Sequence, residues 1–404
     1  MIFGDIKTKT MANLHPGKKN KRNAVKAKTN RKTSHQAPEK SSFHVMSLEE
    51  MAQKEMIPGK GKEPSKYSQF RERTSELYIK SKKEPKIEVV KNLIDRETGL
   101  WKLGFRSPEG PVVSGLPVLH EEKVTIRELT SLERYSDTRA YRPPWVSMEY
   151  LPKIIPHRIA NLNGRIRDLV RFTGMPEMHF LDYDAHEALT MSFPWRCIGK
   201  ITSGSDSGPG SSGTGVLVGP NLMMTASHLW KWGAPGRWMH FSPGFREGPQ
   251  HPESFVTRIR GIQSDGDPTG YDYIICQLQK PLGEMIGWMG SQSFGDEDDY
   301  YDPDWISVGY PGVFYNGMRP AVDFDIGIRD IDNDDPGLEL ETTYNTAFGG
   351  GWSGGPLWGV INNDFKIIGI KSGWEVDVYD PARGVFSGGN HMVDLIKHGL
   401  ANFK

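Results

Sequence analysis

The chain has 404 residues, and its 50 basic side chains balance its 50 acidic ones, so the formal net charge is zero. This balance argues against a nucleic-acid-binding protein, and no run of about 18 apolar residues predicts a membrane-spanning helix. The cysteines are Cys197 and Cys276 alone, so the fold has to rely on a packed core rather than on a disulfide framework. The sequence does not decide whether these two cysteines pair.

The N-terminal end is strongly basic. Residues 1–40 carry eleven Lys or Arg residues against Asp5 and Glu39, a local net charge of +9. Because residues 1–45 also contain almost nothing to bury, we expect a disordered basic tail there. No apolar run of about 7 to 15 residues follows Met1, so no secretory signal is legible and we expect an intracellular or non-classically secreted protein.

Residues 46–185 form a second, highly charged region without a catalytic pattern. Local residue patterns predict helices over Ser47–Met56, Pro85–Asp95 and Ile159–Phe172. We interpret this region as a pro-segment or accessory region, and we expect its removal by a cut within residues 175–191.

The character of the sequence changes at about Phe193. From there, short strand-like runs alternate with turns rich in Gly, Pro and Asp, and a helical pattern returns only at Met392–Leu400. Many short strands with one closing helix indicate an all-β barrel or sandwich. The predicted strands are Arg196–Ile201, Gly215–Val218, Leu222–Thr225, Tyr273–Leu278, Trp305–Val308, Leu338–Thr342 and Lys366–Ile370.

A glycine-rich turn at Gly349–Pro356 contains the strongest candidate for a nucleophile. Ser353 is flanked by glycines, which allow two backbone segments to approach closely. The backbone N–H groups of Gly351 and Ser353 would then bind the oxyanion of a tetrahedral intermediate. Glycine-rich turns between strands are common, so this turn has to be judged together with the residues upstream of it.

Two upstream residues lie at strand ends, where the backbone would hold them in place. His228 comes just after the buried strand Leu222–Thr225, a position that suits a general base. Asp272 stands at the mouth of the apolar run Tyr273–Leu278, where its carboxylate needs a hydrogen-bond donor, and a histidine N–H would provide one. A structural histidine and an ordinary turn aspartate are the alternatives.

Three segments together resemble the signatures of chymotrypsin-like serine endopeptidases, in that family's chain order: Thr225–His228, Tyr271–Asp272 and Gly351–Pro356. The closer resemblance is to the glutamyl endopeptidase, or V8-like, branch, since Phe193–Arg196 is similar to its first strand and Gly309–Gly312 to a turn typical of it. The resemblance covers residues 186–404. It implies two six-stranded antiparallel β-barrels with a cleft between them, and a triad of His228, Asp272 and Ser353 that hydrolyses peptide bonds through an acyl-enzyme.

The same resemblance implies a substrate pocket. Lys371 falls where glutamate-specific members carry a pocket histidine, and a cation there would favour an acidic P1 side chain. Lys371 could equally point to solvent from an alternating strand, and Phe348 stands where those relatives have a hydroxyl residue, so the specificity stays open. Ser372 and His391 are further candidates for the pocket or its rim.

The sequence departs from the family at the residue before the nucleophile. Trypsin-type zymogens carry an acidic residue there, which pairs with the new N-terminus after cleavage, whereas this chain has Trp352. We therefore expect that activation switch to be absent.

Two other functions are compatible with parts of the pattern. Gly351–Gly355 also fits the G-x-S-x-G elbow of α/β-hydrolase esterases, but glycine and proline follow the serine where that fold needs a helix. Asp377 or Asp380 with His391 would have to complete such a triad, and His228 would be idle. The second alternative is a catalytically silent protease-like module that binds or scaffolds a partner.

The acidic stretches Asp296–Asp299 and Asp330–Asp335 do not follow an EF-hand spacing, so we interpret them as solvated loops rather than calcium sites. No His and Cys spacing typical of a transition-metal site occurs. We therefore expect a monomeric serine endopeptidase that acts on protein or peptide substrates and needs no metal, cofactor, nucleic acid or membrane.

Overall fold

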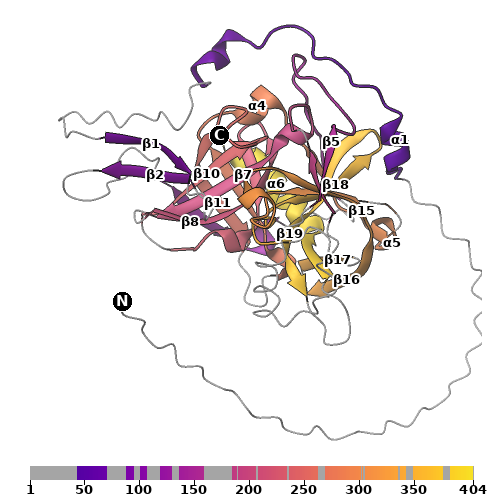
Figure 1. Ribbon diagram of the computed structural model, residues 1–404. Helices are drawn as coiled ribbons and strands as arrows, with labels where there is room; N and C mark the ends of the chain where they lie inside the picture. Colours follow the sequence, from indigo (N-terminus) through magenta and orange to yellow (C-terminus); the bar gives the residue numbers. More distant parts are fainter. Residues whose placement is uncertain are drawn as a thin grey trace, which may run out of the picture. The chain divides into compact units, whose positions relative to one another are not determined.

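Two antiparallel β-barrels and a closing helix make up most of the computed structural model, as the sequence predicted. Figure 1 shows the magenta strands of the first barrel and the orange and yellow strands of the second on different sides of the molecule. The structure describes residues 43–70, 88–94, 101–106, 119–129, 136–158, 184–188, 190–205, 208–233, 236–262, 269–301, 303, 305–334, 337–342, 349–375 and 383–403.

The first barrel is a closed ring of six antiparallel strands. The strands are β7 (Ile198–Ser205), β8 (Gly208–Gly219), β9 (Leu222–Thr225), β10 (Trp238–Pro243), β11 (Ser254–Ile262) and β12 (Ile274–Leu278). Their order is β10–β7–β8–β9–β12–β11, and β11 pairs back with β10 to close the ring. Every residue of β9 is buried, which fits the apolar run that predicted this strand.

The second barrel closes through one bent strand. Its strands are β14 (Trp305–Gly309), β15 (Ala321–Ile326), β16 (Ile328–Asp334), β17 (Gly337–Thr342), β18 (Pro356–Ile361), β19 (Asp364–Glu375) and β20 (Arg383–Gly388). The order runs β16–β17–β20–β19–β18–β14–β15, and Gly327 alone separates β15 from β16. These two strands are one continuous segment, which pairs with β14 in its first half and with β17 in its second, so the pairings run around six strands. β6 and β5 extend the sheet beyond β15.

Residues up to Ala188 add strands to both barrels. Their strands are β3 (His120–Val124), β4 (Asp137–Thr138), β5 (Ile154–Arg158) and β6 (Asp184–Ala188). β3 runs parallel to β11, β4 pairs with the short β13 (Gly290–Gln292), and β5 pairs with β6, which pairs with β15. Several described strands of residues 46–185 are therefore paired with strands of the barrels or of their sheets, whereas β1 and β2 pair only with each other. The role of this region as a pro-segment stays a prediction.

One helix predicted from the sequence is wrong. In place of a helix over Pro85–Asp95, the structure has β1 (Glu88–Ile94), which forms a hairpin with β2 (Trp101–Arg106). This segment contains the β-branched residues Val89, Val90 and Ile94, which favour a strand once a partner strand is present.

Two of the other predicted helices are present in the structure. The helix over Ser47–Met56 is present but shorter, as α1 (Leu48–Ala52), and the closing helix is confirmed as α6 (Asn390–Asn402). The predicted helix over Ile159–Phe172 lies outside the described residues. No described helix is long and apolar enough to cross a membrane. The remaining short helices are α2 (Ile126–Leu129), α4 (Leu282–Ile286), α5 (Asp298–Tyr301), η1 (Ser65–Phe70), η4 (Trp195–Cys197), η5 (Ser227–Leu229), η6 (Thr269–Tyr271) and η7 (Tyr315–Gly317).

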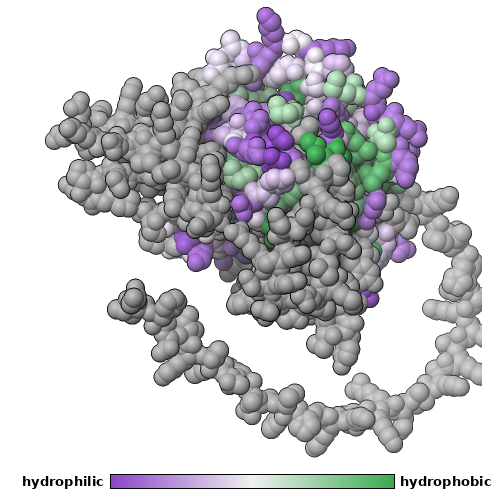
Figure 2. All heavy atoms as spheres, in the orientation of Figure 1, coloured by the Kyte–Doolittle hydropathy of each residue, from purple (hydrophilic) through white to green (hydrophobic). Residues whose placement is uncertain are grey.

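Two clusters of buried apolar side chains hold the described residues together. The larger contains the first-barrel residues and side chains of α6, and the smaller centres on the second barrel with Trp305, Leu340 and Phe386. On the face drawn in Figure 2, purple hydrophilic residues project outward and green apolar residues lie between them. Cys197 and Cys276 are both buried free thiols, which answers the question of their pairing.

We expect the upstream residues to stay bound after a cut of the chain between Arg158 and Asp184. The pairing of β5 with β6, and of β3 with β11, joins the two fragments without the covalent link. The cut protein should therefore elute as one species from a size-exclusion column in native buffer and as two fragments under denaturing conditions. Separate elution in native buffer would show that the strand pairings are too weak to hold the fragments together.

Candidate active site

The backbone fixes His228 at the end of a buried strand. β9 ends at Thr225, Ala226 is fully buried, and the chain then turns into η5, where the Trp230 N–H donates to the Ser227 carbonyl at 3.0 Å. This single turn cannot slide, because β9 is paired on both sides, with β8 and with β12. The strand therefore determines where the imidazole lies.

The register between β9 and β12 brings Asp272 beside His228. Ile274 lies opposite Thr225 in this antiparallel pair. Two residues before Ile274 is Asp272, and two residues after Thr225 is Ser227, so the same register continued past the strand ends sets Asp272 next to η5. The aspartate is 4% exposed.

Asp272 accepts three hydrogen bonds, which meet the cost of burying its carboxylate. Oδ1 accepts from the backbone N–H of His228 at 2.8 Å, and Oδ2 lies 2.6 Å from His228 Nδ1. The Ser372 hydroxyl donates to Oδ2 at 2.6 Å. A carboxylate can only accept, so Nδ1 carries the proton and Nε2 is left as the basic nitrogen. The histidine side chain is 44% exposed against 5% for the aspartate, so a substrate can reach the ring.

The Ser353 turn is pressed against the first barrel. Gly354 has a positive φ of 84°, and a Cβ there would overlap Thr225 Oγ1 and the Thr214 carbonyl. The Thr214 N–H donates to the Ser353 carbonyl at 2.8 Å, and its hydroxyl donates to the Gly351 carbonyl at 2.8 Å. A glycine is therefore required after the serine, and the contact holds the turn beside the strand that leads into His228.

Gly213 connects the surroundings of the serine and the histidine. A Cβ at Gly213 would lie 3.0 Å from the Ser353 carbonyl oxygen and would overlap Leu229, the residue after His228. Ser353 and Leu229 of η5 thus both lie close to the same glycine. Within the described residues the Ser353 hydroxyl makes no hydrogen bond. Catalytic hydrogen bonds often tighten only when substrate binds.

The backbone N–H groups of Gly351 and Ser353 are among those of the serine turn that have no partner within the described residues. The Gly350 carbonyl accepts from the Gly312 N–H at 2.8 Å, and the Trp352 carbonyl accepts from the Gly355 N–H at 2.8 Å. In a trans peptide the C=O and the N–H point in opposite directions. Fixing these two carbonyls therefore points the two N–H groups away from the Gly312 and Gly355 N–H groups that bind the carbonyls. Their role as an anion-binding pair stays a prediction.

Trp352 is part of the core rather than of a charged switch. Its indole is fully buried, donates from Nε1 to Ser307 Oγ at 2.9 Å, and lies so close to Gly309 that a Cβ there would collide with the ring. The turn after Gly309 also reaches the site, because the Tyr310 N–H donates to Thr214 Oγ1 at 3.0 Å. An indole carries no negative charge, so Trp352 cannot form the salt bridge with a new N-terminus that an acidic residue forms at this position in trypsin-type zymogens.

Lys371 does not point to solvent. The residue is 2% exposed, its Nζ has no hydrogen-bond partner among the described residues, and it lies 4.9 Å from the centre of the Phe386 ring. Burial lowers the pKa of its ammonium to about 7, and the charge of Asp323 partly opposes this. Its backbone exchanges hydrogen bonds with Gly354 and Gly355 at 2.8 Å each, so it borders the serine turn.

The other predicted pocket residues are placed as follows. Ser372 donates its hydroxyl to Asp272, and His391, at the start of α6, lies with its ring 5.8 Å from that of Tyr271. Phe348 is outside the described residues. The pocket roles of these three residues stay predictions.

The α/β-hydrolase alternative is wrong for this fold. β18 begins at Pro356, so a strand follows Ser353 where that fold has a helix. His228 is also not idle, since it is bound to Asp272.

No cluster of three or more His, Cys, Asp or Glu residues within the described ranges could hold a metal ion.

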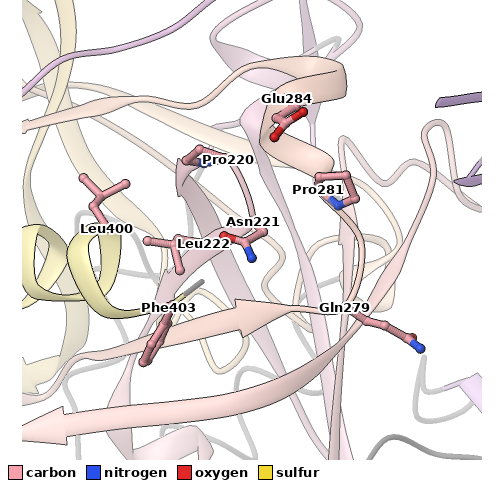
Figure 3. A pocket seen from close by; sticks show the side chains of 8 residues that line it. All are labelled: Pro220, Asn221, Leu222, Gln279, Pro281, Glu284, Leu400 and Phe403. Carbon is pink, nitrogen blue, oxygen red and sulfur yellow. The ribbon is translucent and has the colours of Figure 1, made fainter. Parts of the chain in front are cut away.

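A cavity of about 280 Å³ lies away from the Ser353 turn, between the β8–β9 turn, the residues just before and within α4, and the end of α6 (Figure 3). Its lining contains none of the predicted site residues: it consists of Pro220, Asn221, Leu222, Gln279, Pro281, Glu284, Leu400 and Phe403.

The sequence analysis did not predict the contacts that Thr214 and Ser372 make at the site. Thr214 joins the serine turn to the first barrel, and Ser372 is the third donor to Asp272. Both contacts join residues more than 90 positions apart in the chain, so no local sequence pattern predicts them. A threonine in the glycine-bounded run before β9 was the only signal available for Thr214.

The sequence matches no protein-family model and no curated protein. Similar solved structures include the protease Anisep from Arthrobacter nicotinovorans, with 16% identity, a TM-score of 0.40, and coverage of 51% of this chain and 96% of that one. A Glu endopeptidase has 19% identity, a TM-score of 0.41, and coverage of 52% and 93%. The thermostable serine protease AL20 from an extremophilic microorganism has 18% identity, a TM-score of 0.38, and coverage of 51% and 98%.

Proposed function

We propose that this chain is a serine endopeptidase in which Ser353 is the nucleophile, His228 the general base and Asp272 the residue that orients it. The observation that carries the proposal is the contact of His228 Nδ1 with Asp272 at 2.6 Å, next to a serine turn packed on the same strand. A buried acceptor on one imidazole nitrogen and an accessible second nitrogen are what a general base requires.

In the proposed reaction, His228 Nε2 takes the proton of the Ser353 hydroxyl as its oxygen attacks the scissile carbonyl. The Gly351 and Ser353 N–H groups stabilise the negative oxygen of the tetrahedral intermediate. His228 then returns the proton to the leaving amine, which yields an acyl-enzyme and a free amino terminus. A water molecule, deprotonated by the same nitrogen, hydrolyses the ester, and the proton returns to Ser353.

A fluorophosphonate probe tests the nucleophile. The probe should label the wild-type chain on a single serine at about pH 8, with loss of fluoride, and Ser353→Ala should abolish labelling because no other serine is activated. Mass spectrometry of the labelled peptide identifies the site. If the folded wild-type protein is not labelled, the protease proposal is wrong and the silent module gains support.

The three residues should behave as one unit in steady-state kinetics. We expect His228→Ala and Ser353→Ala each to lower kcat on a peptide substrate by a factor on the order of 10⁶, and the double variant to lose little more. Without His228 the Ser353 hydroxyl has no base to take its proton, and without Ser353 the base has no nucleophile to activate. Additive losses in the double variant would contradict a shared mechanism.

The Ser372 hydroxyl should contribute to the rate of catalysis through its hydrogen bond to Asp272, without contacting the substrate. Its hydrogen bond to a carboxylate is of the kind worth about 1.5–3 kcal/mol, so Ser372→Ala should lower kcat between about 10-fold and 100-fold. Ser372→Thr, which keeps a hydroxyl, is the matched control and should retain most of the activity. Equal losses in the two variants would indicate a packing effect instead.

We further propose that Lys371 favours an acidic P1 side chain. A buried ammonium without a hydrogen-bond partner among the described residues gains most from a carboxylate that reaches it. This proposal concerns specificity alone, so the protease proposal does not depend on it.

The preference should depend on pH. The Lys371 pKa of about 7 means that the ammonium is charged below this pH and neutral above it. The ratio of kcat/KM for a P1 Glu substrate to that for its Gln analogue should therefore be highest at about pH 6 and fall towards pH 9, while the effect of His228 cancels in the ratio. Lys371→Met should flatten the profile. A pH-independent ratio, or an unchanged profile in Lys371→Met, would refute the role.

A further inference from the structure

The strand β3 belongs to the upstream region and lies beside the segment that follows His228. It runs parallel to β11, with Glu121 opposite Ile259 and Lys123 opposite Gly261. Side chains alternate along a strand, so Glu121 and Lys123 emerge on one face and Glu122 on the other. The face with Glu121 and Lys123 meets residues 230–233, which we call the post-histidine loop.

Glu121 uses both carboxylate oxygens on this loop. Oε1 accepts from the Trp230 indole N–H at 3.1 Å, and Oε2 accepts from the Gly233 backbone N–H at 2.8 Å. One side chain therefore holds both ends of the post-histidine loop. Trp230 is 3% exposed and lies two residues after His228, so its position is transmitted directly to η5.

Neighbouring contacts also hold the same loop. The Lys123 ammonium lies 5.1 Å from the centre of the Trp232 ring, whose other contacts include the bare backbone of Gly261. The Leu229 carbonyl accepts from the buried hydroxyl of Ser203 at 3.2 Å. The first barrel thus fixes the start of the loop and contacts Trp232 through Gly261, and β3 adds the contacts of Glu121 and Lys123.

We infer that Glu121 is a positioning residue for His228, supplied by the region upstream of the barrels, so that this region is a working part of the proposed protease and not only a segment to be discarded. The inference rests on the proposed function of His228. Glu121 differs from the proposed catalytic residues because it acts on His228 through the post-histidine loop and does not contact the reacting atoms.

Glu122 offers a matched control on the same strand. Its carboxylate pairs with Arg260 on β11, whose side chain is 7% exposed. Within the described residues, no hydrogen bond or ion pair joins Glu122 to the post-histidine loop. Removal of Glu122 leaves a buried guanidinium without its partner, so Glu122→Ala should destabilise the fold at least as much as Glu121→Ala does. A merely structural role of β3 would therefore show itself in both variants.

Kinetics on a peptide substrate form the first test. We expect Glu121→Ala to lower kcat by about tenfold or more with KM changed less than about twofold, because a misplaced base weakens the transition state and not substrate binding. Glu121→Gln keeps one acceptor oxygen and should recover part of the loss. Glu122→Ala should keep the wild-type kcat at a temperature well below its unfolding midpoint. Equal kcat losses in Glu121→Ala and Glu122→Ala, or none in either, would overturn the inference.

A second measurement does not need turnover. The proton on His228 Nδ1, held by Asp272, should give a downfield resonance in the proton NMR spectrum, assigned by its loss in His228→Ala. It should shift or broaden in Glu121→Ala and stay unchanged in Glu122→Ala. An unchanged resonance in Glu121→Ala refutes the positioning role even if the wild-type protein proves inactive, whereas absent fluorophosphonate labelling with a shifted resonance refutes the protease proposal alone.

Discussion

The hydrogen bonds of Thr214 join the two barrels, and the candidate site depends on them. The residue belongs to the first barrel, yet its N–H and hydroxyl hold the carbonyls of Ser353 and Gly351 in the second. Its hydroxyl also accepts from Tyr310, and its carbonyl accepts from Thr225. Thr214 is fully buried, so water cannot replace these partners, and each polar group left unpaired there would cost about 1–3 kcal/mol. The serine turn is therefore fixed by the barrel that carries the histidine.

The reverse dependence holds for the acid. Asp272 belongs to the first barrel, and Ser372, a donor from the second, completes its set of three hydrogen bonds. Each barrel thus positions a residue of the other, and neither could hold the geometry alone. The contrast in exposure fits this arrangement, because the buried carboxylate fixes the imidazole while the ring itself stays open to a substrate. Burial of the carboxylate strengthens its attraction to an imidazolium when the histidine takes a proton.

The sequence predicted those parts of the fold that have a local pattern. β9 and β12 are short apolar runs bounded by turns, and their ends identified His228 and Asp272 before any register was known. β16 carries three aspartates, and the sequence analysis interpreted this stretch as part of an acidic loop. It is a strand because tertiary pairing with β17 overrides a poor strand propensity. The contacts of Thr214, Ser372 and Glu121 join residues more than 90 positions apart, and no window of the sequence contains both partners.

The pairing of β3 with β11 also bears on how the two barrels can be handled in isolation. β12 occupies one edge of β11, so β10 and β3 share the other, with β10 at Ser254 and Phe255 and β3 from Arg258 to Ile262. A chain trimmed to residues 186–404 would expose the N–H and C=O groups of that last stretch. An unpaired strand edge is a template for another chain. Such a fragment would tend to associate edge to edge, and its poor solubility would reflect an incomplete sheet rather than an unstable barrel.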